Sequence, residues 1–415
     1  MAISMHTKGR VTVHFQARRG WPCIQSEISY PRQNHVELFK VSIPAEQIEE
    51  LKARVRSTRW PDSVSDSGWT YGADLKYMQE LREYWLTQFD WRRQEERMNR
   101  FAHFKQNVDG LKIHFIRERG EGKNPLPLLI THGWPGSFLE FLEIIPMLTH
   151  PSRFGGRPED SFDVIAPSLV GFGFSESSTR PGCNVILVAK LWDKLMTSLG
   201  YFTYVAQGGD FGAAVSTRLA MLFPDHVKAI HLNYIPGSYQ PYLEQDDRTA
   251  AEREFAQMVD GWLQKHGAYS HVQRNEPQTL GIALNDSPMG LAAWLVTKFR
   301  EWSDCDGDVE KRFSKDALLS NISLYWFTQT ITSSVRMYYE SRLAPLQLGR
   351  GERVPAPCAI ARFPIESPFP PREWVERGYN VVRWTEMPRG GHFAAAEEPA
   401  LLADDLRSFF RDFRG

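Results

Sequence analysis

The sequence of 415 residues has few cysteines, no long hydrophobic run and no excess of charge of either sign. Its cysteines lie far apart and form no Cys-x-x-Cys pair, which argues against a zinc site and a disulfide framework: Cys23, Cys183, Cys305 and Cys358. No apolar run approaches the roughly 18 residues that a membrane-spanning helix needs. Lysine and arginine number 49 against 50 aspartates and glutamates, so the charge gives no reason to expect a nucleic-acid partner.

What is present is an aromatic-rich globular composition, with 42% hydrophobic residues, 13% aromatic residues and 13 tryptophans. Such rings can line apolar pockets, although most of them form ordinary core. At roughly 150 residues per domain, the length predicts two to three units. We expect a leader, a helical N-terminal segment and a core that a helical cap divides into two parts: 1–35, 36–122, 123–239, 240–345 and 346–415.

The leader at 1–35 contains no acid in its first 26 residues. This composition fits either a transit peptide or a disordered tail, and we favour the tail. In the segment that follows, Ser42 is the expected N-cap of a helix that has Pro44 in its first turn. A second amphipathic helix is predicted over 74–89, and a last helix over 397–413.

Short apolar runs alternate with helical stretches over much of the remaining chain. The runs lie at 126–132, 161–169, 201–207, 227–233, 356–364 and 381–388. This alternation predicts an α/β protein, with a mostly parallel sheet and helices on both faces. Such sheets bind ligands at the carboxyl ends of their strands. Three glycine-containing motifs, "GWPG", "VGFGFS" and "QGGDFGA", follow the first three runs.

The third motif places Asp210 between Gly208 and Gly212, where a strand is predicted to turn into a helix. A nucleophile at such a turn needs small neighbours, because the turn is strained and a β-carbon on either side would clash. The N-terminus of the following helix stabilises an anion there. The same residues also fit a plain turn in which Asp210 caps the helix. The motif alone therefore leaves both interpretations open.

A histidine and a second acid follow in the order that an α/β enzyme with such a nucleophile needs. His392 lies in a glycine-rich loop after the last predicted strand, and Glu366 follows the strand before it. Both positions are at carboxyl ends of strands, so we predict a triad of Asp210, Glu366 and His392. The rival acids for the second position are Asp405, Glu397 and Glu386.

An aspartate where many hydrolases hold a serine indicates reaction at a saturated carbon. The chain has no Gly-x-Ser-x-Gly pattern, and a serine that displaced a group from such a carbon would form an ether. A carboxylate instead forms an ester. Water activated by the histidine can attack the ester carbonyl, while backbone N–H groups hold the oxyanion. Epoxides and alkyl halides are the two substrate classes, and we expect no metal and no organic cofactor.

The leaving group separates these two classes. An opening epoxide leaves an alkoxide that needs a proton, and tyrosine, with an ordinary pKa of about 10, can donate one at neutral pH. A halide needs only N–H donors from tryptophan or asparagine. The cap offers several tyrosines, and the residue types alone do not select among them: Tyr269, Tyr325, Tyr338 and Tyr339.

Six motifs follow one another along the chain: "HGWPGSFLEF", "GFGFSE", "GGDFGA", "LNDSPMGLAAW", "SSVRMYYE" and "GGHFAAAEEP". Together they resemble the microsomal-type epoxide hydrolase family, and the resemblance runs from about residue 36 to the C-terminus. The segment 36–122 is similar to the family's N-terminal extension. The resemblance implies the α/β-hydrolase fold and hydrolysis of lipophilic epoxides to vicinal diols through a covalent ester. Detoxification, including catabolism of aromatic hydrocarbons, is one role that it implies.

Carried over by position, the resemblance implies Asp210 as the nucleophile and His392 as the general base. It implies Glu366 as the charge partner that orients the imidazole. The two proton donors fall on Tyr269 and Tyr338.

The oxyanion hole implied by the resemblance consists of the backbone N–H groups of Trp134 and Phe211. His132, in the same motif as Trp134, is expected to be structural because the role of the base is already filled. Tyr339, next to Tyr338, leaves the second proton donor ambiguous by one residue.

The sequence departs from membrane-bound members of the family, because 1–35 has no apolar anchor. We therefore expect a soluble, cytoplasmic protein and leave peripheral attachment to a membrane open. Its expected partners are a small lipophilic epoxide and water, and a homodimer is a further expectation. Two other hypotheses remain: a haloalkane dehalogenase that uses the same aspartate, and a non-catalytic binder of a lipophilic epoxide or hormone. The natural epoxide and the selectivity do not follow from the sequence.

Overall fold

The computed structural model describes residues 2–6, 10–14, 36–244 and 247–414. The chain divides into two compact units, Met1–His35 and Val36–Gly415. In the first unit, strands β1 (Ala2–His6) and β2 (Arg10–His14) pair antiparallel. The sequence predicts no regular structure there, but "RVTVH" has three consecutive β-branched residues, which favour a strand. The rest of the predicted leader lies outside the described residues.

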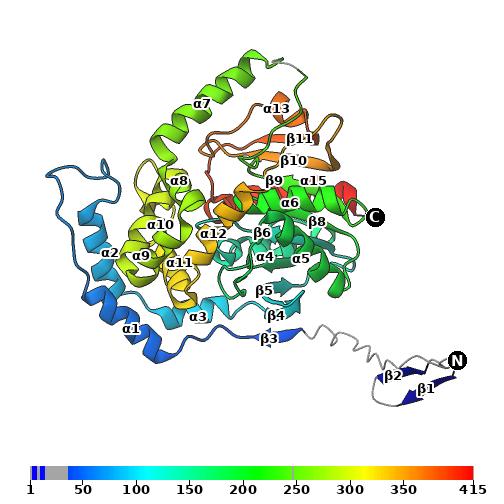
Figure 1. Ribbon diagram of the computed structural model, residues 1–415, viewed down its shortest axis with the longest axis horizontal. Coiled ribbons are helices and arrows are strands. Elements are labelled where there is room, and N and C mark those ends of the chain that lie inside the picture. Colours follow the sequence, from blue (N-terminus) through cyan, green and yellow to red (C-terminus); the bar gives the residue numbers. More distant parts are fainter. Residues whose placement is uncertain (1, 7–9, 15–35, 245–246, 415) are drawn as a thin grey trace, which may run out of the picture. The chain divides into compact units, whose positions relative to one another are not determined.

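Among the described residues of the second unit, nine strands form one sheet (Figure 1). They are β3 (Glu37–Phe39), β4 (His103–Val108), β5 (Leu111–Glu118), β6 (Leu126–Thr131), β7 (Phe162–Pro167), β8 (Tyr204–Gly208), β9 (Val227–Leu232), β10 (Val354–Arg362) and β11 (Tyr379–Glu386). Their order is β11-β10-β9-β8-β6-β7-β5-β4-β3. Strands β6 to β11 run parallel, whereas β5 is antiparallel to β7 and β4, and β4 to β3.

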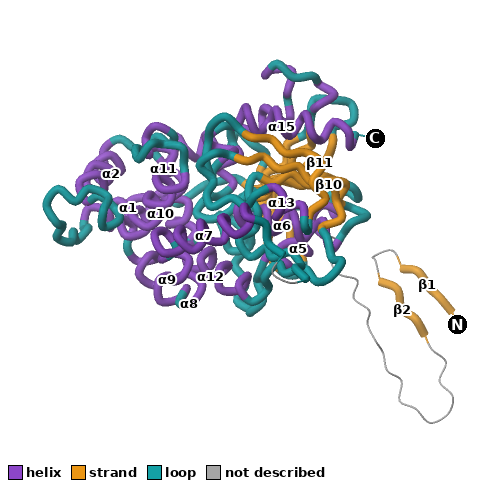
Figure 2. Tube along the Cα trace, turned by 90° about the horizontal axis from the view of Figure 1, so that it is seen from above, coloured by secondary structure: helices purple, strands orange, loops and turns teal. Residues whose placement is uncertain are grey.

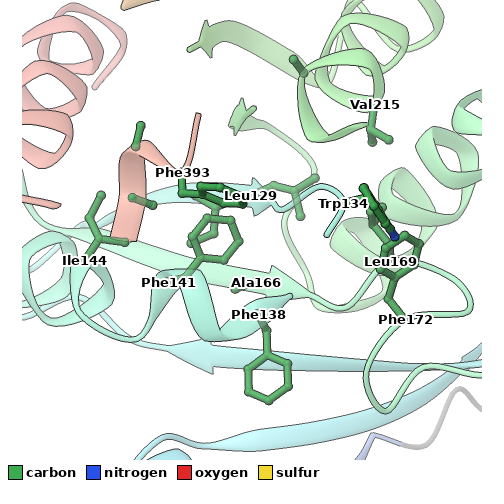
Figure 3. Close-up of a cluster of buried hydrophobic side chains, with 14 of the residues drawn as sticks. Leu129, Trp134, Phe138, Phe141, Ile144, Ala166, Leu169, Phe172, Val215 and Phe393 are labelled. Atoms are coloured by element: carbon green, nitrogen blue, oxygen red, sulfur yellow. The ribbon is translucent and has the colours of Figure 1, made fainter. Parts of the chain in front are cut away.

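The six apolar runs of the sequence correspond to β6–β11, so the predicted α/β fold with a mostly parallel sheet is confirmed. The core lies where these strands meet the helices. Figure 3 shows Phe141 and Phe393 packed together beside Leu129 of β6, with Ala166 of β7 close by. Each of these side chains is almost fully buried. Burial of one large apolar side chain contributes about 1.5–3 kcal/mol.

Helices cover both faces of the parallel part of the sheet. Figure 2 shows α5 (Val185–Ser198), α6 (Asp210–Leu222) and α13 (Arg372–Glu376) on one side of β10 and β11, and α15 (Pro399–Phe410) on the other. Helix α15 also packs against α4 (Ile144–Thr149). The remaining helical segments of the core are η1 (Phe138–Phe141), η2 (Pro151–Phe154), η3 (Pro158–Asp160), α14 (Ala394–Glu397) and η5 (Arg411–Phe413).

The chain between β9 and β10 forms a cap of helices. They are α7 (Ala250–His266), α8 (Ala268–Asn275), α9 (Pro277–Asp286), α10 (Pro288–Trp302), η4 (Val309–Lys311), α11 (Lys315–Thr328) and α12 (Ile331–Arg342). Helices α1 (Ala45–Arg56) and α2 (Leu75–Thr87) lie against α10, and α2 also contacts α11 (Figure 1). They are followed by α3 (Trp91–Met98). The N-terminal helices therefore support the cap.

Three local features differ from the sequence-based expectations. Ser42 is not an N-cap, because α1 begins at Ala45 directly after Pro44, whose fixed φ suits a helix start. The segment 36–122 contains β3, β4 and β5 besides its helices. The last helix, expected over 397–413, begins at Pro399 because this residue has no N–H to continue α14, and its final turn is the separate segment η5. Among the described residues, no helix has the length and apolar character needed to cross a bilayer.

Candidate active site

The turn between β8 and α6 positions Asp210 at the carboxyl edge of the sheet. Strand β8 ends at Gly208, and α6 begins at Asp210, whose φ of 47° lies in the left-handed region. That conformation costs a residue with a β-carbon roughly 1–2 kcal/mol. A β-carbon on Gly208 would lie 2.1 Å from the carbonyl carbon of Gly212, and one on Gly212 would lie 1.8 Å from the carbonyl oxygen of Thr131. The turn therefore requires both glycines.

The two carboxylate oxygens of Asp210 have different neighbours. Oδ1 accepts a hydrogen bond of 2.8 Å from the backbone N–H of Trp134, whereas Oδ2 lies 3.8 Å from Nε2 of His392. Burial raises the pKa of Asp210, while His392 and the backbone N–H groups of Trp134 and Phe211 act to lower it. Donors therefore surround a carboxylate that is largely removed from water.

The loop after β11 brings His392 to the same edge of the sheet. Its Nδ1 lies 2.8 Å from Oε2 of Glu366, and its backbone N–H donates to the carbonyl of Trp302 at 2.9 Å. Burial alone would lower the pKa of His392, but the carboxylates of Glu366 and Asp210 raise it to about 9. One carboxylate therefore orients the imidazole, and the opposite ring nitrogen faces the other carboxylate.

Glu366 is the acid that contacts His392, and it is buried. The three rival acids have other partners: Asp405 bonds to His231 and Arg383, Glu397 accepts from the backbone of Asp304 and Phe393, and Glu386 pairs with Arg362. The geometry thus separates Glu366 from the alternatives that residue type and order leave open.

The cap brings Tyr269 of α8 and Tyr338 of α12 together, with their ring centroids 6.0 Å apart. The ring of Trp134 stacks on Tyr269 at 5.6 Å, and the ring of Phe211 meets Tyr338 edge-on at 4.9 Å. Burial raises the pKa of both phenols, and the nearby carboxylate of Asp210 raises it further. Both hydroxyls therefore keep their protons at neutral pH.

The hydroxyl of Tyr338 is buried and, among the described residues, makes no hydrogen bond of ordinary geometry, although that of Tyr269 lies close enough to influence its pKa. The other two candidate tyrosines point elsewhere. Tyr325 donates to the carbonyl of Gly136 at 2.8 Å, and the ring of Tyr339 lies 4.7 Å from the guanidinium of Arg342. Tyr269 and Tyr338 are thus the pair that faces the Asp210 region.

His132 is held between backbone groups. Its Nε2 accepts from the N–H of Leu169 at 3.1 Å, so its Nδ1–H donates to the carbonyl of Gly133 at 3.0 Å. Burial lowers the pKa of His132 to about 4. A neutral imidazole with both nitrogens bonded to the backbone fixes the position of the loop that carries Trp134.

A cavity of about 20 Å³ lies beside Asp210 and His392, and it contains polar groups that the sequence analysis did not identify. They are Glu140, Gln207 and Asn233. Glu140 has a signal in the sequence, because it is an acid inside the apolar stretch "SFLEF" just after a predicted strand. The two amides have none. In the described part of the chain, no three His, Cys, Asp or Glu side chains are grouped so that they could hold a metal ion.

Two family models match the chain. One is described as "Epoxide hydrolase N terminus" and matches residues 36–141, which extends past the predicted boundary at 122. The other is described as "alpha/beta hydrolase fold" and matches residues 127–279. The first match covers the N-terminal helices, β3–β6 and the loop of Trp134, and the second covers the turn that carries Asp210.

Curated relatives and solved structures agree with these matches. The chain is 38% identical to Epoxide hydrolase 1 of Sus scrofa, over 94% of this chain and 92% of the relative. The structure of juvenile hormone epoxide hydrolase from Bombyx mori superimposes with a TM-score of 0.78 at 32% identity, over 92% of this chain and 94% of that one. The Aspergillus niger epoxide hydrolase gives 0.80 at 31% identity, over 92% and 98%. The chain therefore belongs to the epoxide hydrolase family of the α/β-hydrolase fold.

Proposed function

We propose that the chain hydrolyses lipophilic epoxides to vicinal diols through an ester formed at Asp210, without a metal or an organic cofactor. The observation that carries the proposal is the arrangement around this carboxylate. One oxygen of Asp210 faces the His392–Glu366 pair. The ring of Tyr269 stacks on Trp134, and the ring of Tyr338 meets Phe211 edge-on. The names of the relatives agree with this activity.

In the first step, Oδ2 of Asp210 attacks a ring carbon of the epoxide, and the bond from that carbon to the ring oxygen breaks. The ring oxygen takes a proton from Tyr269 or Tyr338. Removal of both phenols from water strengthens their hydrogen bonds to the developing alkoxide. The aromatic side chains around the site favour an apolar substrate. The product of this step is a hydroxyalkyl ester and a tyrosinate.

In the second step, water attacks the ester carbonyl carbon of Asp210 while His392 takes one of its protons. The backbone N–H groups of Trp134 and Phe211 stabilise the oxyanion. The acyl–oxygen bond then breaks, and the diol leaves with the oxygen that belonged to Asp210. One proton from water ends on this second hydroxyl and the other returns to the tyrosinate, so the enzyme is restored.

Haloalkane dehalogenation at the same aspartate is a second candidate. The indole N–H groups of Trp134 and Trp302 are buried without a hydrogen-bond partner among the described residues, and a departing halide needs such donors. The two phenols favour the epoxide, because a halide takes no proton. A non-catalytic binder would have no use for the His392–Glu366 pair.

The first test is diol formation from a panel of aryl and alkyl epoxides, with Asp210→Ala measured beside the wild-type protein. We expect diol from the wild type and a loss of about 10⁴-fold or more in the variant, because the nucleophile is removed. Halide release from alkyl chlorides and bromides is assayed in parallel. Halide without any diol would favour the second candidate.

A single turnover in oxygen-18 water tests the ester itself. The first diol should carry unlabelled oxygen, since one of its hydroxyls comes from Asp210. Full incorporation of solvent oxygen in the first turnover would falsify the ester route and indicate direct attack by water.

We further propose a cytoplasmic, soluble homodimer without a nucleic-acid partner. The balanced charge of the sequence supports the absence of nucleic acid. Size-exclusion chromatography with light scattering measures the oligomeric state, and fractionation of cells measures the location.

A further inference from the structure

We propose that Glu140 holds the hydrolytic water together with His392, in the cavity behind Asp210. This inference rests on the proposed function and assigns to Glu140 a role in the second step only. Glu140 is then the group that positions the water for attack on the ester. The tyrosines serve the first step from the cap.

The position of Glu140 follows from the short helix η1. Ser137 is the N-cap of this helix, and Glu140 lies three residues later, so that its side chain folds back along the loop. A β-carbon on Gly136 would lie 1.3 Å from Oε1 of Glu140. The carboxyl group therefore occupies the space that the missing side chain of Gly136 leaves free, beside the loop that carries Trp134.

The cavity that Glu140 lines fits one water molecule. Its volume is about 20 Å³, and a single water needs a cavity of roughly 10–15 Å³ with two to four polar partners. Glu140, Asp210 and His392 all line this space. Nε2 of His392 lies 3.8 Å from Oδ2 of Asp210. The proposed base is therefore next to the oxygen that the first step esterifies.

The charge of Glu140 is linked to the state of Asp210. The pKa of Glu140 is raised to about 8, chiefly by burial and also by the charge of Asp210, while His392 and the backbone N–H of Ser137 act to lower it. Esterification removes the negative charge of Asp210. This change favours ionisation of Glu140 in the second step, in which the water is held for attack and gives a proton to His392.

A purely structural role for Glu140 is the alternative. A glutamate three residues after a serine N-cap accepts from the backbone N–H of that serine, as in a capping box. Glutamine retains this acceptor, so Glu140→Gln removes the charge and keeps the cap. The substitution therefore separates the two roles.

The experiment measures the two steps separately, by stopped-flow alkylation and by the decay of the ester in single turnovers. For Glu140→Gln we expect alkylation within about twofold of the wild type and ester hydrolysis slowed by about tenfold or more, so the ester accumulates and is detected by intact mass. Glu143→Gln is the matched control, because Glu143 is an exposed carboxylate three residues away that pairs with Arg97. It should leave both steps unchanged.

Hydrolysis within threefold of the wild type, or an equal loss in both steps, overturns the proposal. If Glu140→Gln does not fold, Glu140→Asp is measured instead, since it keeps the charge and shortens its reach by one methylene. Slower hydrolysis with unchanged alkylation then supports the role, and unchanged hydrolysis overturns it. Failure of the proposed function gives a different result from failure of the Glu140 proposal, because the wild-type protein would then form no ester.

Discussion

At the scale of single residues, the two oxygens of Asp210 are not equivalent. Oδ1 is held by the N–H of Trp134 at 2.8 Å, and Oδ2 is the one that faces His392. A donor on Oδ1 draws negative charge toward that oxygen and fixes the plane of the carboxylate. In the proposed mechanism, Oδ2 is therefore the attacking oxygen. Oδ1 would become the ester carbonyl oxygen and would already lie among the donors proposed to stabilise its oxyanion.

The two phenols should act as a pair. Tyr269→Phe and Tyr338→Phe are each expected to slow alkylation by about 10-fold to 100-fold, and the double variant by about 10³-fold or more, because proton transfer to the alkoxide is lost. Stopped-flow quenching of tryptophan fluorescence measures this step. Tyr339→Phe is the control, since Tyr339 lies against Arg342. An effect of Tyr339→Phe equal to that of Tyr338→Phe would contradict the assignment.

Residue type, order along the chain and position at strand ends were sufficient to select Asp210 and His392, and they favoured Glu366 without excluding the three rival acids. They were insufficient to choose between Tyr338 and Tyr339, because neighbours on a helix point about 100° apart and only the packing of α12 determines which one faces inward. Glu140 stands out as an acid in an apolar stretch, but the sequence does not place it beside Asp210 and His392, which come from distant parts of the chain.

At the scale of elements, the turn from β8 to α6 depends on close approach of backbones. Gly212→Ala is expected to destabilise the protein by about 3 kcal/mol, because its β-carbon would lie 1.8 Å from the carbonyl oxygen of Thr131. Gly261→Ala in α7 is the matched control, since a β-carbon there meets no atom within 4 Å. It should stabilise the helix by about 0.5–1 kcal/mol. Chemical unfolding measures both, and equal effects would contradict the steric argument.

The elements that the sequence predicted best are those in which apolar residues follow one simple pattern, either a continuous run or a helical repeat. The buried runs of β6–β11 and the amphipathic helices at 45–56 and 75–87 are of this kind. The hairpin of β4 and β5 was missed because the pattern is mixed there. His103, Gln106 and His114 are polar but buried: His103 and His114 hydrogen-bond to each other, and Gln106 bonds to Ser198 in α5. Burial of a polar group is costly unless it has a hydrogen-bond partner. The partner of Gln106 lies 92 residues away along the chain, and the two histidines become partners only when the hairpin forms.

At the scale of the whole molecule, Asp405 joins the C-terminal helix to two strands. Its carboxylate lies 2.9 Å from Nε2 of His231 in β9 and accepts from Arg383 and Thr385 in β11. Burial alone would raise the pKa of Asp405, but His231 and then Arg383 lower it to about 2. A carboxyl with a lowered pKa contributes stability above its unfolded pKa of 3.8, and that stability is lost as the pH falls through about 2.

Asp405→Asn should therefore lower the free energy of unfolding by about 3 kcal/mol at pH 6, since it leaves buried partners of Asp405 unpaired. The difference from the wild type should shrink by about 1 kcal/mol at pH 3, where part of the linked stability is already lost. Urea unfolding at both pH values measures this. Asp404→Asn, at an exposed neighbouring position, should change stability by less than about 1 kcal/mol. A difference that grows toward pH 3 would contradict the sign of the linkage.

The cap also holds the loop of His392. The carbonyl of Trp302 accepts from the N–H of His392, Asp304 accepts from the N–H of Gly390, and the N–H of Asp304 donates to Glu397. These three contacts thus join the end of α10 and the residues after it to the loop of His392 and to the following α14. A chimera that exchanges caps between relatives to alter substrate preference must therefore keep 302–304 together with the loop of His392, as parts of the proposed active site. An exchange that replaces this segment would change the pocket and also remove the carbonyl that holds the backbone of His392.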